Sequence, residues 1–94
     1  MKAIYRSEYQ AFLDLLKGRR AEAGLTQIQC SEALGRPQSF MSDVERGVRR
    51  LDVIQIYDLC KILGCDFGSL MNEFQAAADR TYAESAGSQE SSDE

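Results

Sequence analysis

A chain of 94 residues is long enough for one small domain and too short for two. It has no His and no Trp, it carries a net charge of −4 at pH 7, and no stretch approaches the roughly 20 apolar residues of a membrane helix. The N-terminal residues lack the apolar core of a signal peptide, so we expect a protein that stays in the cytoplasm without contact to a membrane.

The acidic charge is confined to the C-terminal end of the chain. Residues 1–78 contain ten Lys/Arg and ten Asp/Glu, whereas residues 79–94 contain one Arg and five acidic residues, which accounts for the −4. A neutral domain can still bind nucleic acid when its positive charges lie on one face. Four arginines gather in one part of this chain: Arg36, Arg46, Arg49 and Arg50.

The cysteines do not indicate a disulfide framework or a metal site. Cys30, Cys60 and Cys65 are odd in number, lie within apolar patterns and include no CxxC pair. Buried free thiols are the simplest interpretation, and redox sensing through an exposed thiol is the alternative. Because the sequence also lacks His and a Gly-rich phosphate loop, we expect no cofactor and no enzymatic activity.

The first helix is predicted to follow a short arm at residues 1–6. Ser7 and Gln10 form a capping-box pattern, and Gly24 is expected to end the helix. Four apolar residues follow at helical spacing and predict one core-facing stripe: Tyr9, Phe12, Leu13 and Leu16. Arg20 continues this stripe, so its guanidinium needs a carboxylate if it is buried.

Residues 26–47 predict two short helices joined by a tight turn. Thr26 is a good N-cap for a helix at about 27–34, and Gly35 suits the left-handed residue that ends it. Pro37 can open a second helix at about 38–46, which Gly47 closes.

The second of these helices has one apolar and one polar face. Met41 and Val44 are predicted to face inward, with Phe40 at the edge. The outward-facing side chains are mostly short and polar: Gln38, Ser39, Ser42, Asp43 and Arg46. This composition suits a helix that hydrogen-bonds base edges in the major groove of DNA.

Two further helices are predicted after a basic loop at residues 48–51. Asp52 caps a helix at about 53–63, which has so little polar surface that we expect it to be the central buried helix. Asp66 caps a last helix at about 67–78. Residues 79–94 are Ser-rich and acidic and are predicted to be disordered. A solubilising role is the simplest for this tail; the alternatives are a site read by a protease or partner, and a segment that lies on the basic face.

In their order and spacing, these segments resemble the helix-turn-helix family of Cro and the phage repressors, the xenobiotic-response-element type. The matching pieces are Thr26–Gln27, Leu34–Gly35, Gln38–Ser42, Glu45–Gly47, Arg49–Val53 and Leu63–Asp66, and the likeness covers about residues 8–75. The resemblance implies an all-α, five-helix, lambda-repressor-like DNA-binding domain at residues 7–78. It also implies a homodimeric transcriptional regulator, most simply a repressor, that reads a pseudo-palindrome of double-stranded DNA.

The resemblance further implies roles for individual residues. The residues expected to contact bases are Gln38, Ser39, Phe40, Ser42 and Asp43, with Gln38 on adenine and Phe40 on a thymine methyl. The residues expected to contact phosphates are Gln27, Arg36, Arg46, Arg49 and Arg50, with Gln27 braced against Gln38. An ion pair of Arg20 with Glu45 is expected to tie the first helix to the recognition helix, and Met71 and Phe74 are expected near a two-fold axis.

The main departure from the family pattern is Asp43, and it leaves a rival function open; Pro37, in place of the frequent Ser or Thr cap, is a second departure. Asp43 places a carboxylate where relatives often carry a non-acidic group, so it either specifies a cytosine or weakens binding. Ser31 stands where the family usually has Ala. The rival is an antitoxin or another protein-binding adaptor, whose main ligand would be a toxin, an antirepressor or a protease.

Overall fold

The computed structural model describes residues 6–89, with side chains for residues 6–84. These residues form five helices: α1 (Ser7–Ala23), α2 (Gln27–Ala33), α3 (Phe40–Glu45), α4 (Val53–Leu63) and α5 (Phe67–Gln89). The predicted all-α, five-helix fold is therefore confirmed. Of the predicted N-terminal arm and acidic tail, residues 1–5 and 90–94 lie outside the described residues.

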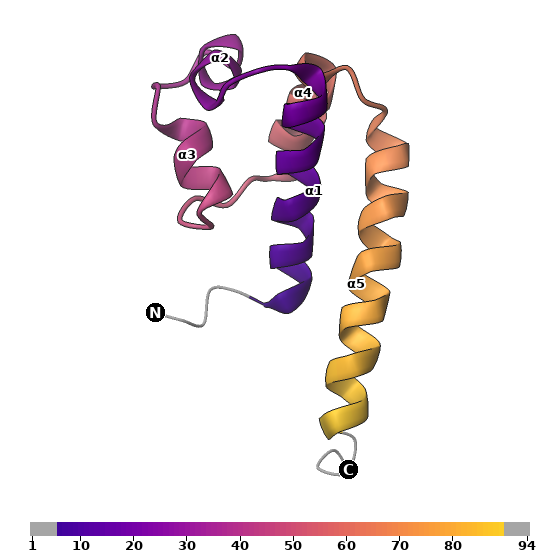
Figure 1. Cartoon of the computed structure of the whole chain (residues 1–94). Coiled ribbons are helices and arrows are strands. Elements are labelled where there is room, and N and C mark those ends of the chain that lie inside the picture. The colour runs from indigo at the N-terminus through magenta and orange to yellow at the C-terminus, as the bar shows by residue number, and fades with distance from the viewer. Residues whose placement is uncertain (1–5, 90–94) are drawn as a thin grey trace.

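The two long helices form one layer and the helix-turn-helix lies beside it. Figure 1 shows α1 and α5 running antiparallel, α2 and α3 on one side of α1, and α5 continuing past the N-terminal end of α1. All five helices contribute to a single buried core: Phe12, Leu13, Leu16, Cys30, Phe40, Met41, Val44, Leu59, Cys60, Leu63 and Leu70. The short α2 and α3 are therefore held by packing against the longer helices rather than by their own length.

Hydrogen bonds cap both ends of α2, and those at its C-terminal end set the tight turn to α3. The Thr26 hydroxyl accepts from Gln29 N–H, and the Gln29 side chain accepts from Thr26 N–H. At the other end Gly35 has φ +72°, and the N–H of Arg36 donates to the carbonyl of Ser31. This bond belongs to a Schellman motif, which needs the left-handed conformation that glycine adopts most easily.

Two helix starts differ from the sequence prediction. The N-cap of α1 is Arg6 and no side chain caps it, because Ser7 already lies inside the helix and Gln10 instead donates to Asp14. The expected Ser7–Gln10 capping box is therefore wrong. Residues 38–39 form a turn ahead of α3, and Phe40 N–H donates to the carbonyl of Pro37.

The prediction that the 53–63 helix is the central buried one is wrong. Leu59, Cys60 and Leu63 are buried at its C-terminal half, but the first turns expose three large side chains: Val53, Ile54 and Tyr57, with 59%, 64% and 45% of their surface accessible. The helix thus has two apolar faces, and only one of them meets the core. We call the exposed three residues the α4 surface.

The last helix is longer than predicted. It continues from residue 78 to Gln89, through part of the segment that the sequence predicts to be disordered. Its early turns pack on α1, where the ring of Phe74 lies edge-on to that of Phe12 with centroids 5.4 Å apart. None of the described helices is long and apolar enough to cross a membrane.

Candidate nucleic-acid interface

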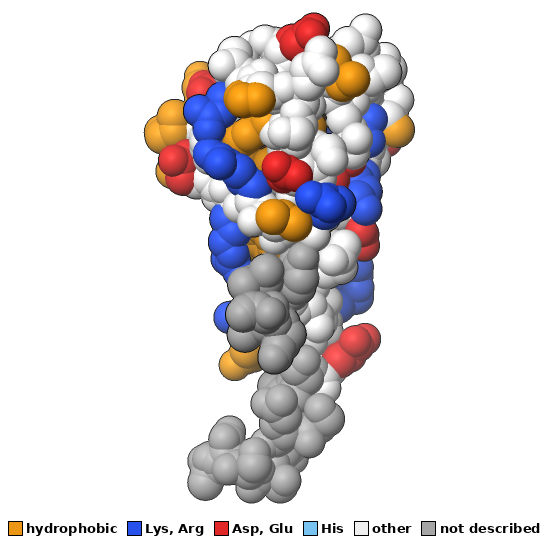
Figure 2. Space-filling model, turned by 90° about the vertical axis from the view of Figure 1, so that its left-hand side faces the viewer, with side chains coloured by type: hydrophobic (Ala, Val, Ile, Leu, Met, Phe, Trp, Pro, Cys, Tyr) orange, Lys and Arg blue, Asp and Glu red, His pale blue; other side chains and the backbone are white. Residues whose placement is uncertain are grey.

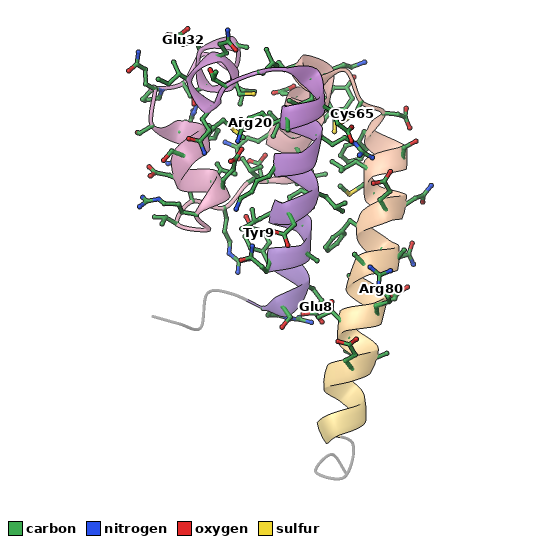
Figure 3. The ribbon with its side chains drawn as sticks, viewed as in Figure 1. Glu8, Tyr9, Arg20, Glu32, Cys65 and Arg80 are labelled. Atoms are coloured by element: carbon green, nitrogen blue, oxygen red, sulfur yellow. The ribbon has the colours of Figure 1, made fainter. Side chains whose placement is uncertain are left out.

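A partly buried ion pair ties α1 to α3. The Nε of Arg20 donates to Oε2 of Glu45 at 2.6 Å and its Nη2 donates to Oε1 at 2.9 Å, which is the bidentate geometry that guanidinium favours. The third donor group, Nη1, binds the carbonyl of Leu25 at 3.0 Å. Figure 3 shows Arg20 in the C-terminal half of α1. The pair expected from the resemblance is thus present.

Glu45 is 4% exposed, and its charge is held by more than one donor. Gln27 at the start of α2 donates its amide to Oε1 of Glu45 at 2.9 Å. Burial by itself would raise the pKa of Glu45, but the hydrogen bonds from Arg20 and Gln27 and the nearby positive charges outweigh it and lower the pKa. Gln27 is therefore engaged with Glu45, and the expected bracing of Gln27 against Gln38 is not the contact that the structure shows.

A serine joins the two helices of the helix-turn-helix directly. Ser31 is fully buried; its hydroxyl donates to the carbonyl of Gln27 at 3.0 Å and accepts the N–H of Met41 at 2.9 Å. The N–H of Met41 lies in the first turn of α3, where helical N–H groups have no partner within the helix. The resemblance placed Ser31 where the family usually has the equally small Ala, but nothing in the sequence indicated this hydrogen bond.

The polar side chains of the helix-turn-helix lie on the outer surface. Gln38 and Ser39 are exposed, and Ser42 and Asp43 are half-buried. Phe40 is not part of this surface: it is 4% exposed and belongs to the core, so the expected contact of Phe40 with a thymine methyl is wrong. An apolar group that does reach the surface beside α3 is Val48, which is 61% exposed and which no motif or spacing in the sequence marked as a site residue.

Arginines surround this polar surface. The guanidinium carbons of Arg36 and Arg49 lie 4.8 Å and 5.2 Å from the centroid of the Phe40 ring, one arginine from before α3 and one from after it. The guanidinium of Arg50 instead lies over Tyr9 of α1, 4.7 Å from the ring centroid. Figure 2 shows Lys and Arg side chains at several places on the side of the molecule that carries α2 and α3, interspersed with acidic and apolar groups.

The carboxylate of Asp43 is paired within its own helix. Arg46 Nη2 donates to Oδ1 of Asp43 at 2.8 Å, with the aspartate side chain 35% exposed. An exposed pair of this kind contributes little to stability. The pair acts on the local charge instead, because the carboxylate of Asp43 neutralises the positive charge of Arg46 beside the polar surface.

We define the reading surface as the exposed and half-exposed residues of this region: Arg36, Gln38, Ser39, Ser42, Asp43, Arg46, Val48 and Arg49. It contains amide, hydroxyl and guanidinium groups, which are the groups that contact base edges and phosphates. Among the described residues no group of three or more His, Cys, Asp or Glu could hold a metal ion.

Comparison with known proteins places this geometry in a protein class. A helix-turn-helix domain model matches residues 11–74, and the chain belongs to that family. More narrowly, it is an XRE/Cro-type helix-turn-helix regulator. A solved structure of an XRE-family like protein from Pseudomonas syringae pv. tomato str. DC3000 is 46% identical, with a TM-score of 0.71 over 76% of this chain and 87% of that one.

A more distant structure shares the fold. The clp gene regulator ClgR from Corynebacterium glutamicum superposes with a TM-score of 0.69 at 21% identity, over 87% of each chain. No curated protein sequence matches this chain. The family establishes a DNA-binding regulator of transcription as the class of function.

Proposed function

We propose that this protein is a sequence-specific repressor that binds a pseudo-palindromic operator as a homodimer, with α3 in the major groove. The observation that carries this proposal is the reading surface, in which a polar row is flanked by arginines on a helix that a partly buried ion pair holds in place. Two copies related by a two-fold axis would read half-sites about one helical turn, roughly 34 Å, apart.

The residues of the reading surface divide into two roles. Gln38, which is exposed ahead of α3, is the candidate for a bidentate contact to adenine, and Ser39 and Ser42 are short enough to reach bases or phosphates. Arg36 and Arg49 flank the helix and would hold the phosphate backbone, which positions the protein without reading sequence. Arg46, Arg50 and Gln27 are further phosphate candidates.

Val48 takes the apolar role that Phe40 cannot fill. It follows Gly47 directly, and it is exposed while Phe40 is buried. An exposed isopropyl group beside a polar row suits contact with the methyl group of thymine. Replacement of Val48 by Ser should therefore relax the preference for thymine at one position of each half-site and leave binding to bulk DNA unchanged.

Asp43 has two roles that one substitution separates. Paired to Arg46, it lowers the positive charge that the reading surface presents to phosphates. An Asp43→Asn variant that binds all sequences more tightly would show that the carboxylate weakens binding. A variant that loses discrimination at a single C·G pair would show that the carboxylate accepts from cytosine N4.

The proposal is tested by fluorescence anisotropy with DNA from upstream of the gene, at low and moderate salt. Gln38→Ala should cost about 1–3 kcal/mol on the operator and nothing on bulk DNA. Arg49→Gln should weaken binding to the operator and to bulk DNA alike. It should also make the slope of log K against log salt less steep by about 0.9 for each lost phosphate contact, which is about 1.8 for a dimer that loses one contact in each subunit. Binding to neither DNA above the non-specific level would remove the operator proposal for that site.

A protein partner is a second candidate ligand, and the α4 surface supports it. Val53, Ile54 and Tyr57 are large, apolar and adjacent, which is unusual for a face that only meets water. The described residues form no separate ligand-sensing unit. Regulation could therefore come from a toxin, an antirepressor or a protease that covers this surface. Ile54→Glu should abolish binding to such a partner and leave DNA binding intact.

A further inference from the structure

The turn between α4 and α5 brings two of the three thiols together. Cys60 is in the last full turn of α4 and Cys65 follows Gly64, which has φ +73°. The N–H of Cys65 donates to the carbonyl of Cys60 at 3.0 Å, and Gly64 N–H donates to the carbonyl of Lys61. These two bonds make a Schellman motif, whose first and last side chains characteristically touch.

The thiols of the pair share one environment. Both line a hollow of about 110 Å³, together with Tyr57, Lys61, Asp66 and Phe67. Figure 3 shows Cys65 at the end of the molecule where α4 passes into α5. Cys65 is half-buried, whereas Cys60 is 2% exposed. Reagents in solvent therefore meet Cys65 first, with Cys60 directly behind it.

We propose that Cys60 and Cys65 are a reversible oxidation site, at which a hydroperoxide converts the two thiols into an intramolecular disulfide. This inference goes beyond the proposed DNA-binding function and does not depend on it. The two cysteines are five residues apart and do not form a CxxC motif. The turn geometry is what brings their thiols together.

The chemistry proceeds in two balanced steps. The thiolate of Cys65 attacks one oxygen of the hydroperoxide; an S–O bond forms, the O–O bond breaks, and the other oxygen leaves as water or an alcohol after protonation. Cys60 sulfur then attacks Cys65 sulfur, the S–S bond forms, the S–O bond breaks, and the oxygen leaves as water with the proton of Cys60. Two thiols are oxidised, one hydroperoxide is reduced, and a dithiol reductant reverses the result by exchange.

The order of attack follows from the surroundings of the two sulfurs. Burial, and then the neighbouring Cys65, raise the pKa of Cys60 to about 12, so Cys60 remains a thiol and is the resolving partner. Cys30 is fully buried in the core, and burial also raises its pKa. It should stay reduced while the pair reacts.

The test uses the full chain, treated with hydrogen peroxide, blocked with N-ethylmaleimide, and digested with trypsin without reduction. Cleavage after Arg50, Lys61 and Arg80 places Cys60 in peptide 51–61 and Cys65 in peptide 62–80. We expect these two peptides to be joined until a reductant is added. The free thiols should fall from three to one per chain, and the chain should stay monomeric on non-reducing gels.

Three variants make the result decisive. Cys30→Ser should give the same joined peptides, Cys65→Ser should give none, and Cys60→Ala should stop at a sulfenic acid that dimedone labels at Cys65. Circular dichroism of each variant checks that it is folded. Retention of all three thiols, links between chains, or a link that involves Cys30 would overturn the proposal. So would a disulfide that forms no faster in the folded chain than in guanidinium.

Discussion

At the scale of single residues, the buried contacts of the helix-turn-helix are polar as well as apolar. Glu45 and Ser31 are the two buried polar side chains of the described residues, and each bonds to a neighbouring helix. Apolar packing would tolerate small rotations of α3, whereas these hydrogen bonds have fixed directions. The orientation of the reading surface therefore depends on two side chains that lie beneath it.

Loss of the buried carboxylate should be costly at neutral pH. Glu45→Gln leaves the Arg20 guanidinium, with 20% of its side chain exposed, without its charge partner. We expect the free energy of unfolding to fall by about 3 kcal/mol, the low end for breaking a buried pair, since Arg20 keeps some access to water. Urea unfolding measured by circular dichroism at pH 7 gives the value, with Asp14→Asn on the exposed side of α1 as the control.

The same variant predicts a pH dependence. Because the pKa of Glu45 is lowered in the folded state, the stability that it contributes is complete above its unfolded pKa of about 4.3 and is lost as pH falls through the folded value. The difference between wild type and Glu45→Gln should therefore shrink below about pH 4. A constant difference from pH 7 to pH 3 would contradict the assignment of the charge to Glu45.

Ser31→Ala tests the hydrogen bond between α2 and α3. The substitution keeps the residue small but leaves the N–H of Met41 without its acceptor, which should cost about 1–2 kcal/mol. Ser39→Ala is the matched control, because Ser39 is exposed and makes no capping bond. If both variants unfold at the same denaturant concentration as wild type, Ser31 contributes packing alone and its hydrogen bond adds nothing to stability.

At the scale of elements, glycines with positive φ lie where α1, α2 and α4 end. Gly35 lies between α2 and α3 with φ +72°, while Gly18 lies inside α1 with helical geometry. A Cβ atom added at either position would meet no atom within 4 Å. Any difference between the two substitutions therefore reports backbone conformation and not a steric clash.

Alanine should act in opposite directions at these two glycines. Gly18→Ala should stabilise by about 0.5–1 kcal/mol, since glycine is a poor helix former. Gly35→Ala should destabilise by about 1 kcal/mol or more, because alanine must adopt a left-handed conformation. Thermal unfolding measures both shifts. Equal shifts of the same sign would show that the turn does not hold Gly35 in its left-handed geometry.

At the scale of the whole molecule, the part that the structure describes offers two apolar regions suited to association. Met71 and Phe74 line a wholly apolar hollow of about 160 Å³, with Tyr9, Phe12 and Ile56 around it, and the α4 surface is separate from them. We propose the hollow as the two-fold contact, as the resemblance implies, and the α4 surface as the contact for another protein. An isologous contact places the same residues of both copies at the axis.

Sedimentation of two variants distinguishes these regions. Met71→Lys should shift the equilibrium toward monomer by at least about tenfold, since a charge enters an apolar contact. Ile54→Glu should leave the equilibrium unchanged. The reverse pattern would move the self-contact to α4. Circular dichroism is required for Met71→Lys, because Met71 is also half-buried against the core of its own chain.

The sequence by itself determined most of the helix ends of this protein. Capping residues and glycines have short-range causes, and so Thr26, Asp52, Gly24 and Gly35 act at the helix ends as predicted. Apolar spacing also put Met41 and Val44 on one face of their helix, and that face is the buried one. Periodicity alone indicated only that Arg20 needs a carboxylate partner if it is buried. The family pattern identified that partner as Glu45.

Only the tertiary structure decided which of several apolar faces is covered. Phe40 and Ile54 are both large and apolar, but the packing of α1, α3 and α4 buries the first and exposes the second. The direction of Gln27 toward Glu45 and the bond of Ser31 to Met41 are likewise set by the positions of neighbouring elements. Helical periodicity gives the direction of a side chain about its own axis, whereas burial depends on what lies opposite, and that requires the fold.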